Sequence, residues 1–463
     1  MFFTRSPARA LSGVSAIALC ALVSACAPRV QLPVAPGIGV LDWNEDWQNP
    51  AGAQAAQSWS SFGSEPLAAL IAEARRANPD IEIAIARIDQ ARGDAGVARS
   101  ENGPEIGLSA NGSSDIRNLQ GQTKSLNRIG SVGIDVSYDL DLFGAAKASR
   151  RAAWARLSAA GYDRRTIELT IEADVASAFV RQAALNDRLK INARALQSAR
   201  KLERIIRIRA AEGVASVIDV GIQTTEGDAI EVEMSQLAED RAIIGNALAV
   251  LVGAEAPAFS VPDASLSNLV IPAFAQVQPA DLLTRRPDIR AAEARIAAAD
   301  GNVANARAVF MPQIRLSADS FFDLASNGGI LNPGGSLTAS ILATIFDRGR
   351  LKGRLTRAVG EQNEAVASYK KAVLAALTET RNALSIAREA DFRLATLQRS
   401  RGDAERTATL SRMQFAEGRT SLNTLLEADR RLLAVDEGLT QAREVRLLAA
   451  ITLFRAIGGA PRS

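Results

Sequence analysis

Two long stretches of the chain carry apolar residues at the spacing of amphipathic helices. The stretch from Ala145 to Glu212 has no proline and a single glycine, Gly161, and the stretch from Leu351 to Glu417 has a similar pattern. Apolar residues recur near helical and heptad spacing in both. Each predicted helix would extend roughly 100 Å at about 1.5 Å per residue. Because no compact domain is that wide, both helices must lie along neighbouring helices to be stable.

A glycine ends each long stretch. Gly213 and Gly418 are followed by further helical patterns, from Val217 to Val252 and from Leu422 to Ile457. The pattern therefore predicts two long helical hairpins, each with its tip at a glycine. Glycine is common just after a helix C-terminus. A bare helical tip also suits contact with the tip of another helical hairpin, so Gly213 and Gly418 are candidate docking points for an adaptor.

Apolar residues that alternate with a period of two precede each long helix. The alternation begins just after Pro104 and Pro312, which end the preceding helices. The alternating residues are Ile106, Leu108, Ala110, Val132, Ile134, Val136 and Tyr138 in the first half, and Ile314, Leu316, Ala318, Leu337, Ala339 and Ile341 in the second. Loops rich in Asn, Gly and Ser are expected at 111–130 and 326–335. Each half thus predicts one β-hairpin, with strands of about ten residues, the length that a membrane barrel strand needs.

The two halves of the chain repeat one another. Pro79-Asp80-Ile81 returns as Pro287-Asp288-Ile289, and Ala211-Glu212-Gly213 returns as Ala416-Glu417-Gly418. Shared helical composition does not explain matched proline and glycine positions, so the pattern indicates an internal duplication.

These patterns divide the chain into six segments. They are a signal peptide at 1–25, a tether at 26–64, a first repeat at 65–255, a linker at 256–278, a second repeat at 279–458 and a C-terminal tail at 459–463. Each repeat has the same order of a helix, a β-hairpin and a long helical hairpin. The opening helices are expected from Glu65 to about Ser100 and from Pro279 to about Val309.

The N-terminus has the layout of a lipoprotein signal. Arg5 and Arg9 precede an apolar run that is too short to span a bilayer, and small residues then lead to Cys26. In bacterial lipoproteins the cysteine at this place is lipidated, and several acyl chains hold a protein firmly on a membrane. Cys26 is therefore the predicted lipidation site, and an ordinary cleaved signal with a chance cysteine is the alternative. Residue 27 is alanine, not the aspartate of the common inner-membrane retention signal.

The stretch from Val30 to Ser64 is rich in Pro, Gly, Gln and Trp, including Trp43, Trp47 and Trp59. This composition indicates an extended tether from the lipid anchor to the folded body. Its tryptophans either pack on the body or lie at the membrane interface, and the sequence leaves both alternatives open.

The composition argues against catalysis. Lysine and arginine number 54 against 51 aspartates and glutamates, and the net charge of +3 is too even to indicate nucleic-acid binding. The absence of histidine excludes a His general base, a Ser-His-Asp triad and any His-ligated metal site. Both cysteines, Cys20 and Cys26, lie near the N-terminus, so a chain starting at Cys26 could form no internal disulfide and no Cys-rich zinc site. We therefore expect no enzyme activity, no cofactor and no metal.

Taken in order, these features resemble a known family. The lipobox, the Pro-Asp-Ile helix starts, the two strand hairpins and the Ala-Glu-Gly tips are similar to those of the TolC-like outer-membrane efflux proteins. Asp141-Leu142-Phe143-Gly144 and the run Leu-Leu-Thr-Arg-Arg-Pro-Asp-Ile at 282–289 most resemble its lipid-anchored, NodT-type branch, which serves resistance–nodulation–division pumps. The resemblance covers nearly the whole mature chain.

The resemblance implies a homotrimer in the bacterial outer membrane. Each chain would add four strands to a shared twelve-stranded β-barrel, continued through the periplasm by a long α-helical barrel. The strand count agrees, because four strands are too few to close a barrel around a pore. The implied partners are a periplasmic adaptor (membrane fusion) protein and an inner-membrane transporter of the resistance–nodulation–division type. The implied function is passive conduction of drugs or other small molecules to the exterior.

In the resembling family the closed constriction lies at the periplasmic tip, where the hairpin after Gly418 supplies an acidic residue that is tripled by symmetry. The matching residue is Glu427, and Asp219 of the first repeat is a weaker candidate. Asn423 stands where the family tends to have an apolar residue, which favours a polar gate over a hydrophobic plug.

Three carboxylates that converge on one axis repel one another. Arg419, Arg412 and Arg430 are the expected compensating residues. The alternative is that all of these side chains are ordinary solvated charges near helix ends.

Two other functions remain open. One is an exit duct for a secretion system, which the neighbouring transporter gene would distinguish. The other is a lipid-anchored coiled-coil spacer without a pore, in which the alternating segments at Ile106 and Ile314 would be loops.

Overall fold

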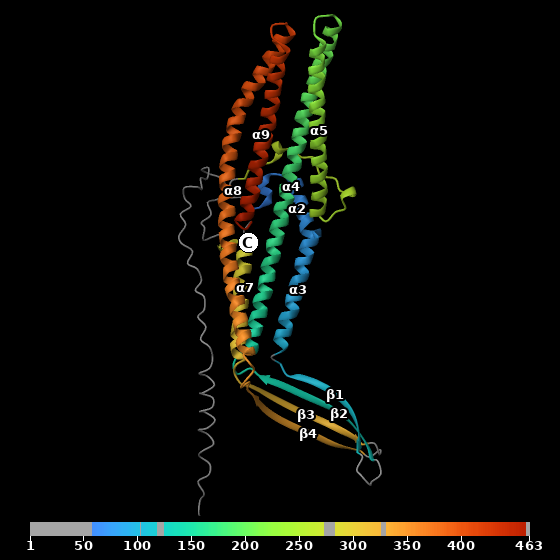
Figure 1. Ribbon diagram of the computed structural model, residues 1–463, viewed down its shortest axis with the longest axis vertical. Helices are drawn as coiled ribbons and strands as arrows, with labels where there is room; N and C mark the ends of the chain where they lie inside the picture. The colour runs from blue at the N-terminus through green and yellow to red at the C-terminus, as the bar shows by residue number, and fades with distance from the viewer. Residues whose placement is uncertain (1–57, 102, 118–124, 273–282, 326–329, 460–463) are drawn as a thin grey trace, which may run out of the picture. The chain divides into compact units, whose positions relative to one another are not determined.

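The structure is a computed structural model, and it describes residues 58–101, 103–117, 125–272, 283–325 and 330–459. Cys26, the signal peptide and most of the predicted tether lie outside these residues. The elements up to residue 272 are η1 (Trp59–Phe62), α2 (Glu65–Ala77), α3 (Pro79–Ser100), β1 (Glu105–Arg117), β2 (Ser125–Leu140), α4 (Ala145–Ala211), α5 (Val217–Leu251), η2 (Ala256–Ala258) and η3 (Leu266–Asn268). Those that follow are α7 (Pro287–Ala308), β3 (Gln313–Ala325), β4 (Ile330–Leu342), α8 (Arg350–Ala416) and α9 (Leu422–Ala456), as Figure 1 shows.

Corresponding helices of the two halves have equal lengths. Helices α3 and α7 each have 22 residues, α4 and α8 each have 67, and α5 and α9 each have 35. The duplicated sequence thus folds into a duplicated structure. The mixture of long helices with four strands per chain confirms the predicted fold class.

The predicted helix from Glu65 to Ser100 is wrong in one respect, because it is two helices, α2 and α3. Asn78 lies between them with an extended backbone (φ −73°, ψ 126°). Its side-chain oxygen accepts hydrogen bonds from the N–H groups of Asp80 and Ile81 at 2.9 and 3.3 Å, which caps α3. Pro79 favours the break, since the residue before a proline avoids helical dihedrals. Likewise, α7 begins at Pro287 rather than at residue 279. Residues 283–285 are helical, but the helix breaks at Arg286, and residues 279–282 lie outside the described part.

The predicted loops at 111–130 and 326–335 are too long. Strand β1 continues to Arg117, β2 already begins at Ser125, and β4 begins at Ile330. Asn, Gly and Ser disfavour strands on their own, but here each takes part in a ladder, as Gly112 does opposite Gly130. Pro333 is tolerated because β4 is an edge strand. Residues 118–124 and 326–329 lie outside the described part.

The four strands form one antiparallel sheet in the order β1-β2-β3-β4. The two predicted hairpins join where β2 pairs with β3. Within the described chain, β1 and β4 therefore each pair along one side only, which leaves two open edges.

The chain divides into two compact units. The described part of the first, called here the sheet unit, is Arg87–Gly161 with Ala291–Lys370. The described part of the second, the hairpin unit, is residues 58–86, Tyr162–Arg290 and residues 371–459.

Helix α7 packs against both long helices in the sheet unit. Asn305 donates to the carbonyl of Ala145 at 2.8 Å, and Val303 packs on Leu355 of α8. A Cβ added to Gly301 would lie 2.8 Å from the Cβ of Ala152. The close approach of α7 to α4 therefore requires glycine.

The hairpin unit contains two antiparallel helix pairs, α4 with α5 (green in Figure 1) and α8 with α9 (orange to red). Near their tips an apolar cluster joins Ile206 of α4 to Leu422 and Leu426 of α9. Among the described helices, none combines the length and the apolar character needed to cross a membrane.

Candidate functional site

One face of the sheet is apolar and exposed. Side chains alternate along a strand, so the pairing register decides which residues share a face. Ile106 lies opposite Val136, which lies opposite Ala318, which in turn lies opposite Leu337. The exposed apolar residues of this face include Ile106, Leu108, Ile134, Phe322, Leu337 and Ile341, each with 52–86% of its surface accessible. Such a continuous apolar surface needs a non-aqueous neighbour.

The opposite face is mostly polar, although Phe321 and Leu342 also lie on it by register. Asp139 of β2 accepts two hydrogen bonds from the Arg315 guanidinium of β3, at 2.6 and 2.7 Å. Ser336 of β4 donates to Asp319 at 2.6 Å. Asp135, Ser137 and Thr338 share this face by register. A sheet with one apolar and one polar face can separate lipid from water.

Both predicted hairpin tips are glycine-capped helix ends. Gly213 and Gly418 have φ of 75° and 73°, which is left-handed backbone that favours glycine. The next N–H group bonds back to the preceding helix, from Val214 to the Arg209 carbonyl and from Arg419 to the Gln414 carbonyl, both at 2.8 Å. The glycines therefore act as helix caps, and their role as docking points stays a prediction.

The two tips differ in chemistry. Beside Gly213, Val214, Val217 and Ile218 expose 72–83% of their surfaces. Beside Gly418, Arg419 and Glu417 form an exposed ion pair at 2.6 Å. One tip is thus apolar and the other charged.

Asp219 caps a helix. It is the third residue of α5, and its carboxylate accepts a hydrogen bond from the Ser216 N–H at 3.0 Å. The Ser216 hydroxyl in turn accepts from the Ile218 N–H at 3.1 Å. This reciprocal capping box is a structural reason for an acid at position 219.

Glu427 is exposed on α9, with 66% of its side chain accessible. Arg431, one turn later, donates to it at 3.2 Å. Asn423, one turn earlier, is also exposed, so Asn423 and Glu427 share a face of α9. Their assignment to a gate stays a prediction.

The three expected compensating arginines pair with other carboxylates in this chain. Arg419 pairs with Glu417, Arg412 with Asp429 at 2.8 Å, and Arg430 with Glu226. Within the described residues, none of them forms an ion pair with Glu427. The hydrogen bond to Glu226, and then the charges of Glu226 and Glu427, raise the pKa of Arg430, so Arg430 compensates Glu427 without a direct ion pair.

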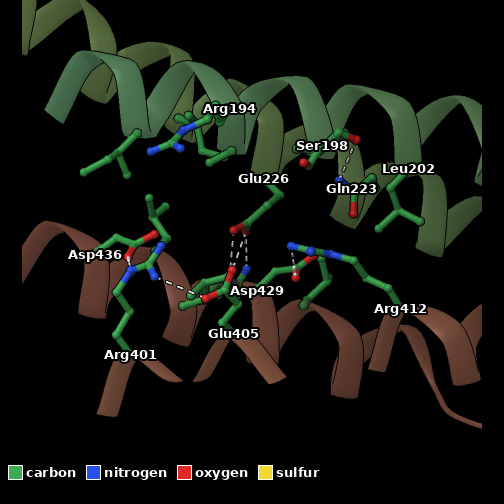
Figure 2. Close-up of a pocket in the computed structure, with 18 residues that line it drawn as sticks. Arg194, Ser198, Leu202, Gln223, Glu226, Arg401, Glu405, Arg412, Asp429 and Asp436 are labelled. Atoms are coloured by element: carbon green, nitrogen blue, oxygen red, sulfur yellow. Dashed lines mark hydrogen bonds and ion pairs between the residues drawn. The ribbon is translucent and has the colours of Figure 1, made fainter. Parts of the chain in front are cut away.

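A groove of about 220 Å³ lies between the two helix pairs, and Figure 2 shows its lining. Arg430 of α9 donates to Glu226 of α5 at 3.0 Å, which joins one pair to the other. Burial raises the pKa of Asp429 even though Arg412 lies 2.8 Å away. Arg401 donates to Asp436 at 2.7 Å on the α8–α9 side. Bonded carboxylates and guanidiniums thus line much of the groove.

Sequence reasoning missed the polar contacts that join the two repeats. Besides Arg430 with Glu226, Asn192 of α4 donates to Glu437 of α9 at 2.7 Å. The partners are 204 and 245 residues apart in the chain. No helical spacing rule identifies pairs at such separations.

Trp59 packs on the folded body. It is 5% exposed, and its indole N–H donates to Glu172 at 2.6 Å. Arg75 donates to the same carboxylate at 2.5 Å. Trp43 and Trp47 lie outside the described residues.

In the part of the chain that the structure describes, no three His, Cys, Asp or Glu side chains are grouped so as to hold a metal ion.

Comparisons with known proteins agree with this architecture. The outer membrane efflux protein family matches residues 70–254 and 279–459. The pyoverdine export outer membrane protein OpmQ of Pseudomonas aeruginosa is 30% identical over 97% of both chains. The probable outer membrane lipoprotein SilC of Salmonella typhimurium is 24% identical over 97% of this chain and 98% of its own. The solved outer-membrane channel OprN has a TM-score of 0.83 at 25% identity, covering 93% of this chain and 98% of OprN. The chain therefore belongs to the outer membrane efflux protein family and has the fold of its channels.

Proposed function

We propose that three copies of this chain form the outer-membrane exit duct of a tripartite efflux pump and conduct small molecules passively to the exterior. The observation that carries the proposal is the sheet, with one exposed apolar face, one polar face and two open edges. Rotational symmetry would pair β1 of one chain with β4 of the next. Three four-stranded sheets would then close around a polar lumen with their apolar faces in lipid.

The helical hairpins would continue the duct toward the pump. Membership of the efflux family supports this placement, as does the pairing of helices too long to stand alone. A periplasmic adaptor and an inner-membrane transporter of the resistance–nodulation–division type are the proposed partners. The apolar tip at Gly213 and the charged tip at Gly418 would give the adaptor two different contacts.

Cys26 is the proposed lipid anchor. The sequence before it supports this, as does SilC, which is named a lipoprotein and is similar along nearly its whole length. Cys26→Ser should abolish incorporation of labelled palmitate. Unchanged labelling would remove the assignment.

Glu427 is the proposed gate carboxylate, with Asn423 on the same face of α9. Because Asp219 also caps α5, single variants separate the two roles. Glu427→Gln should raise single-pore conductance or leak of a large antibiotic, whereas Asp219→Asn should mainly loosen the start of α5. Glu417→Gln, at an exposed ion pair near the same tip, is the control. Equal conductance in Glu427→Gln and wild type would remove the gate assignment.

The duct itself is tested with purified full-length protein in planar bilayers. A sheet-bearing trimer with stepwise conductance is the expected result. A monomer in detergent, or a trimer without conductance, would favour the coiled-coil spacer. The transported substrate is tested in a deletion strain, in which loss of drug efflux and loss of pyoverdine export are measured side by side, because OpmQ is named for pyoverdine export.

A further inference from the structure

The first turns of α4 and α8 carry an unusual excess of basic residues. The stretches 145–161 and 348–360 contain nine lysines and arginines and no aspartate or glutamate. Six of these residues, Lys147, Arg150, Arg151, Arg348, Lys352 and Arg354, are called here the collar. All except the half-buried Arg150 are exposed.

The collar residues have no carboxylate partners. Many other arginines of the chain are ion-paired, but no ion pair or side-chain hydrogen bond involves any of the six within the described residues. The acids that immediately precede the two stretches in the sequence, Asp141 and Asp347, cap the helices. Asp141 accepts from the N–H groups of Ala146 and Lys147 at 3.1 and 2.8 Å. Asp347 accepts from those of Gly349 and Leu351 at 3.0 and 2.9 Å.

The collar also runs against the usual charge pattern of helices. An α-helix favours acids near its N-terminus, where its dipole is positive, and α2, α3, α5 and α7 each have one in the first turn. Helices α4, α8 and α9 have none in the first turn itself, although Asp141 and Asp347, just before α4 and α8, bond to their first N–H groups. Arg348 is also the only non-glycine residue with positive φ (55°) among the described residues. The basic side chains of the collar thus lie where the helix dipole disfavours positive charge.

Exposed apolar residues lie beside the collar in both repeats. They occupy the turns between strand and helix: Leu142 and Phe143 are 63% and 51% exposed, and Ile345 and Phe346 are 98% and 82% exposed. These turns connect the sheet to the long helices, from β2 to α4 and from β4 to α8 (Figure 1). Helix α7 contacts both helices, so the two halves of the collar lie at one end of the sheet unit.

We propose that the collar binds the phosphate groups of anionic phospholipids in the leaflet next to the helices. Leu142, Phe143, Ile345 and Phe346 would enter the acyl region just beyond the phosphates, as apolar and aromatic side chains do at membrane interfaces. The inference rests on the proposed placement of the sheet in the membrane. Basic side chains near an anionic membrane surface each add roughly fivefold to binding. The collar offers positive charge without carboxylate partners next to exposed apolar side chains. This surface is complementary to a phospholipid layer, in which phosphate groups lie next to acyl chains.

The test uses the full chain as purified trimer in a mild non-ionic detergent. Bound phosphatidylglycerol and phosphatidylcholine are counted by native mass spectrometry. We expect wild type to prefer phosphatidylglycerol by at least about tenfold. The preference should fall to near one in the quadruple variant Arg150→Gln/Arg151→Gln/Lys352→Gln/Arg354→Gln.

The matched control removes the same charge from the same two helices, within the hairpin unit. Lys201→Gln/Arg204→Gln/Arg393→Gln/Arg399→Gln changes four exposed basic residues and should keep the wild-type preference. Loss of preference in this control would overturn the proposal, as would equal binding of both lipids by wild type. Displacement of lipid by inorganic phosphate, but not by sodium chloride of equal ionic strength, would also overturn it in favour of a free-phosphate site.

Conductance of the same preparations separates this inference from the proposed function. If wild type conducts but shows no lipid preference, the collar proposal alone is wrong. If wild type forms no pore, the placement of the sheet in the membrane is wrong. Conducting pores from the quadruple variant would show that it folds, so that its lost preference reports on the collar.

Discussion

Glu203 of α4 illustrates how single charged residues stabilise the first helical hairpin. It accepts hydrogen bonds from Arg200 at 2.9 Å, from Arg207 at 2.6 Å and from the Thr224 hydroxyl of α5 at 3.0 Å. Arg200, and then Arg207, hold the pKa of Glu203 down to about 2. The charged form is therefore bound more strongly in the folded state than in the unfolded chain.

The pH dependence follows from this lowered pKa. The stabilisation by Glu203 is fully present above the unfolded pKa of about 4.3 and is lost as the pH falls through the folded value. Glu203→Gln should lower the stability by about 1 kcal/mol near neutral pH. The difference from wild type, measured by thermal unfolding with circular dichroism, should shrink between about pH 5 and pH 2. Glu239→Gln, at an exposed acid of α5, is the control, and a gap that stays constant with pH would contradict the argument.

Residue types alone predicted where the two longest helices end but not which charges pair. Gly213 and Gly418 cap their helices because few other residues adopt positive φ without strain, and this local requirement is visible in the sequence. The partners of Arg430 and Arg412 depend on which helices lie side by side. They are Glu226 and Asp429, whereas the sequence argument directed these arginines to Glu427.

At the level of elements, three glycines allow the cost of left-handed backbone strain to be compared with the cost of steric crowding. Gly418 has φ of 73°, with no atom near an added Cβ, whereas Gly161 lies inside α4 with open space around it. Gly253, after α5, has φ of 72°, and its Cβ would lie 2.1 Å from the carbonyl oxygen of Ala77. Alanine would therefore meet neither strain nor crowding at Gly161, backbone strain alone at Gly418, and both at Gly253.

The destabilisation caused by alanine should increase in the order Gly161, Gly418, Gly253. Gly161→Ala should stabilise by about 0.5–1 kcal/mol, because glycine is a poor helix former. Gly418→Ala should destabilise by about 1–2 kcal/mol through left-handed strain. Gly253→Ala should cost more than Gly418→Ala, since the backbone itself must move. Denaturant unfolding of the three variants measures the order, and equal effects at Gly418 and Gly253 would show that the clash at Ala77 relaxes freely.

The extent of strands was less predictable than their existence. The period-two pattern located both hairpins, but polar and glycine residues near their ends carry no such pattern. Strand pairing across β1 and β2 extends over these residues because the neighbouring ladder is already in register. The break between α2 and α3 was missed for a related reason, since Asn78 caps α3 by contacts that helical periodicity does not report.

At the level of the whole molecule, the two faces of the sheet should respond differently to charge. Leu337 and Thr338 are neighbours in β4, on the apolar and the polar face respectively. An arginine on the lipid-facing side costs about 2–4 kcal/mol at mid-membrane. Leu337→Arg should therefore prevent assembly in the outer membrane. Thr338→Arg should assemble and shift the ion selectivity of the pore toward anions.

Membrane fractionation and reversal potentials measure these outcomes. Equal assembly of the two variants would show that the exposed apolar face does not contact lipid. The sequence predicted the amphipathic strands behind this test, but only the register shows that all four apolar sets share one face. The open edges of β1 and β4 can be paired only by other chains. One sequence does not show how many chains do so, and the expected trimer therefore came from the family resemblance.

The identical lengths of α4 and α8 restrict how such a chain can evolve. A seven-residue insertion in both arms of the first hairpin, α4 and α5, would carry its tip about 10 Å beyond that of the second hairpin, and one set of docking contacts would be out of reach. Matching insertions must then follow in α8 and α9 before the longer form works. Among natural variants that span a wider periplasm, additions should occur in matched sets, in both arms of both hairpins.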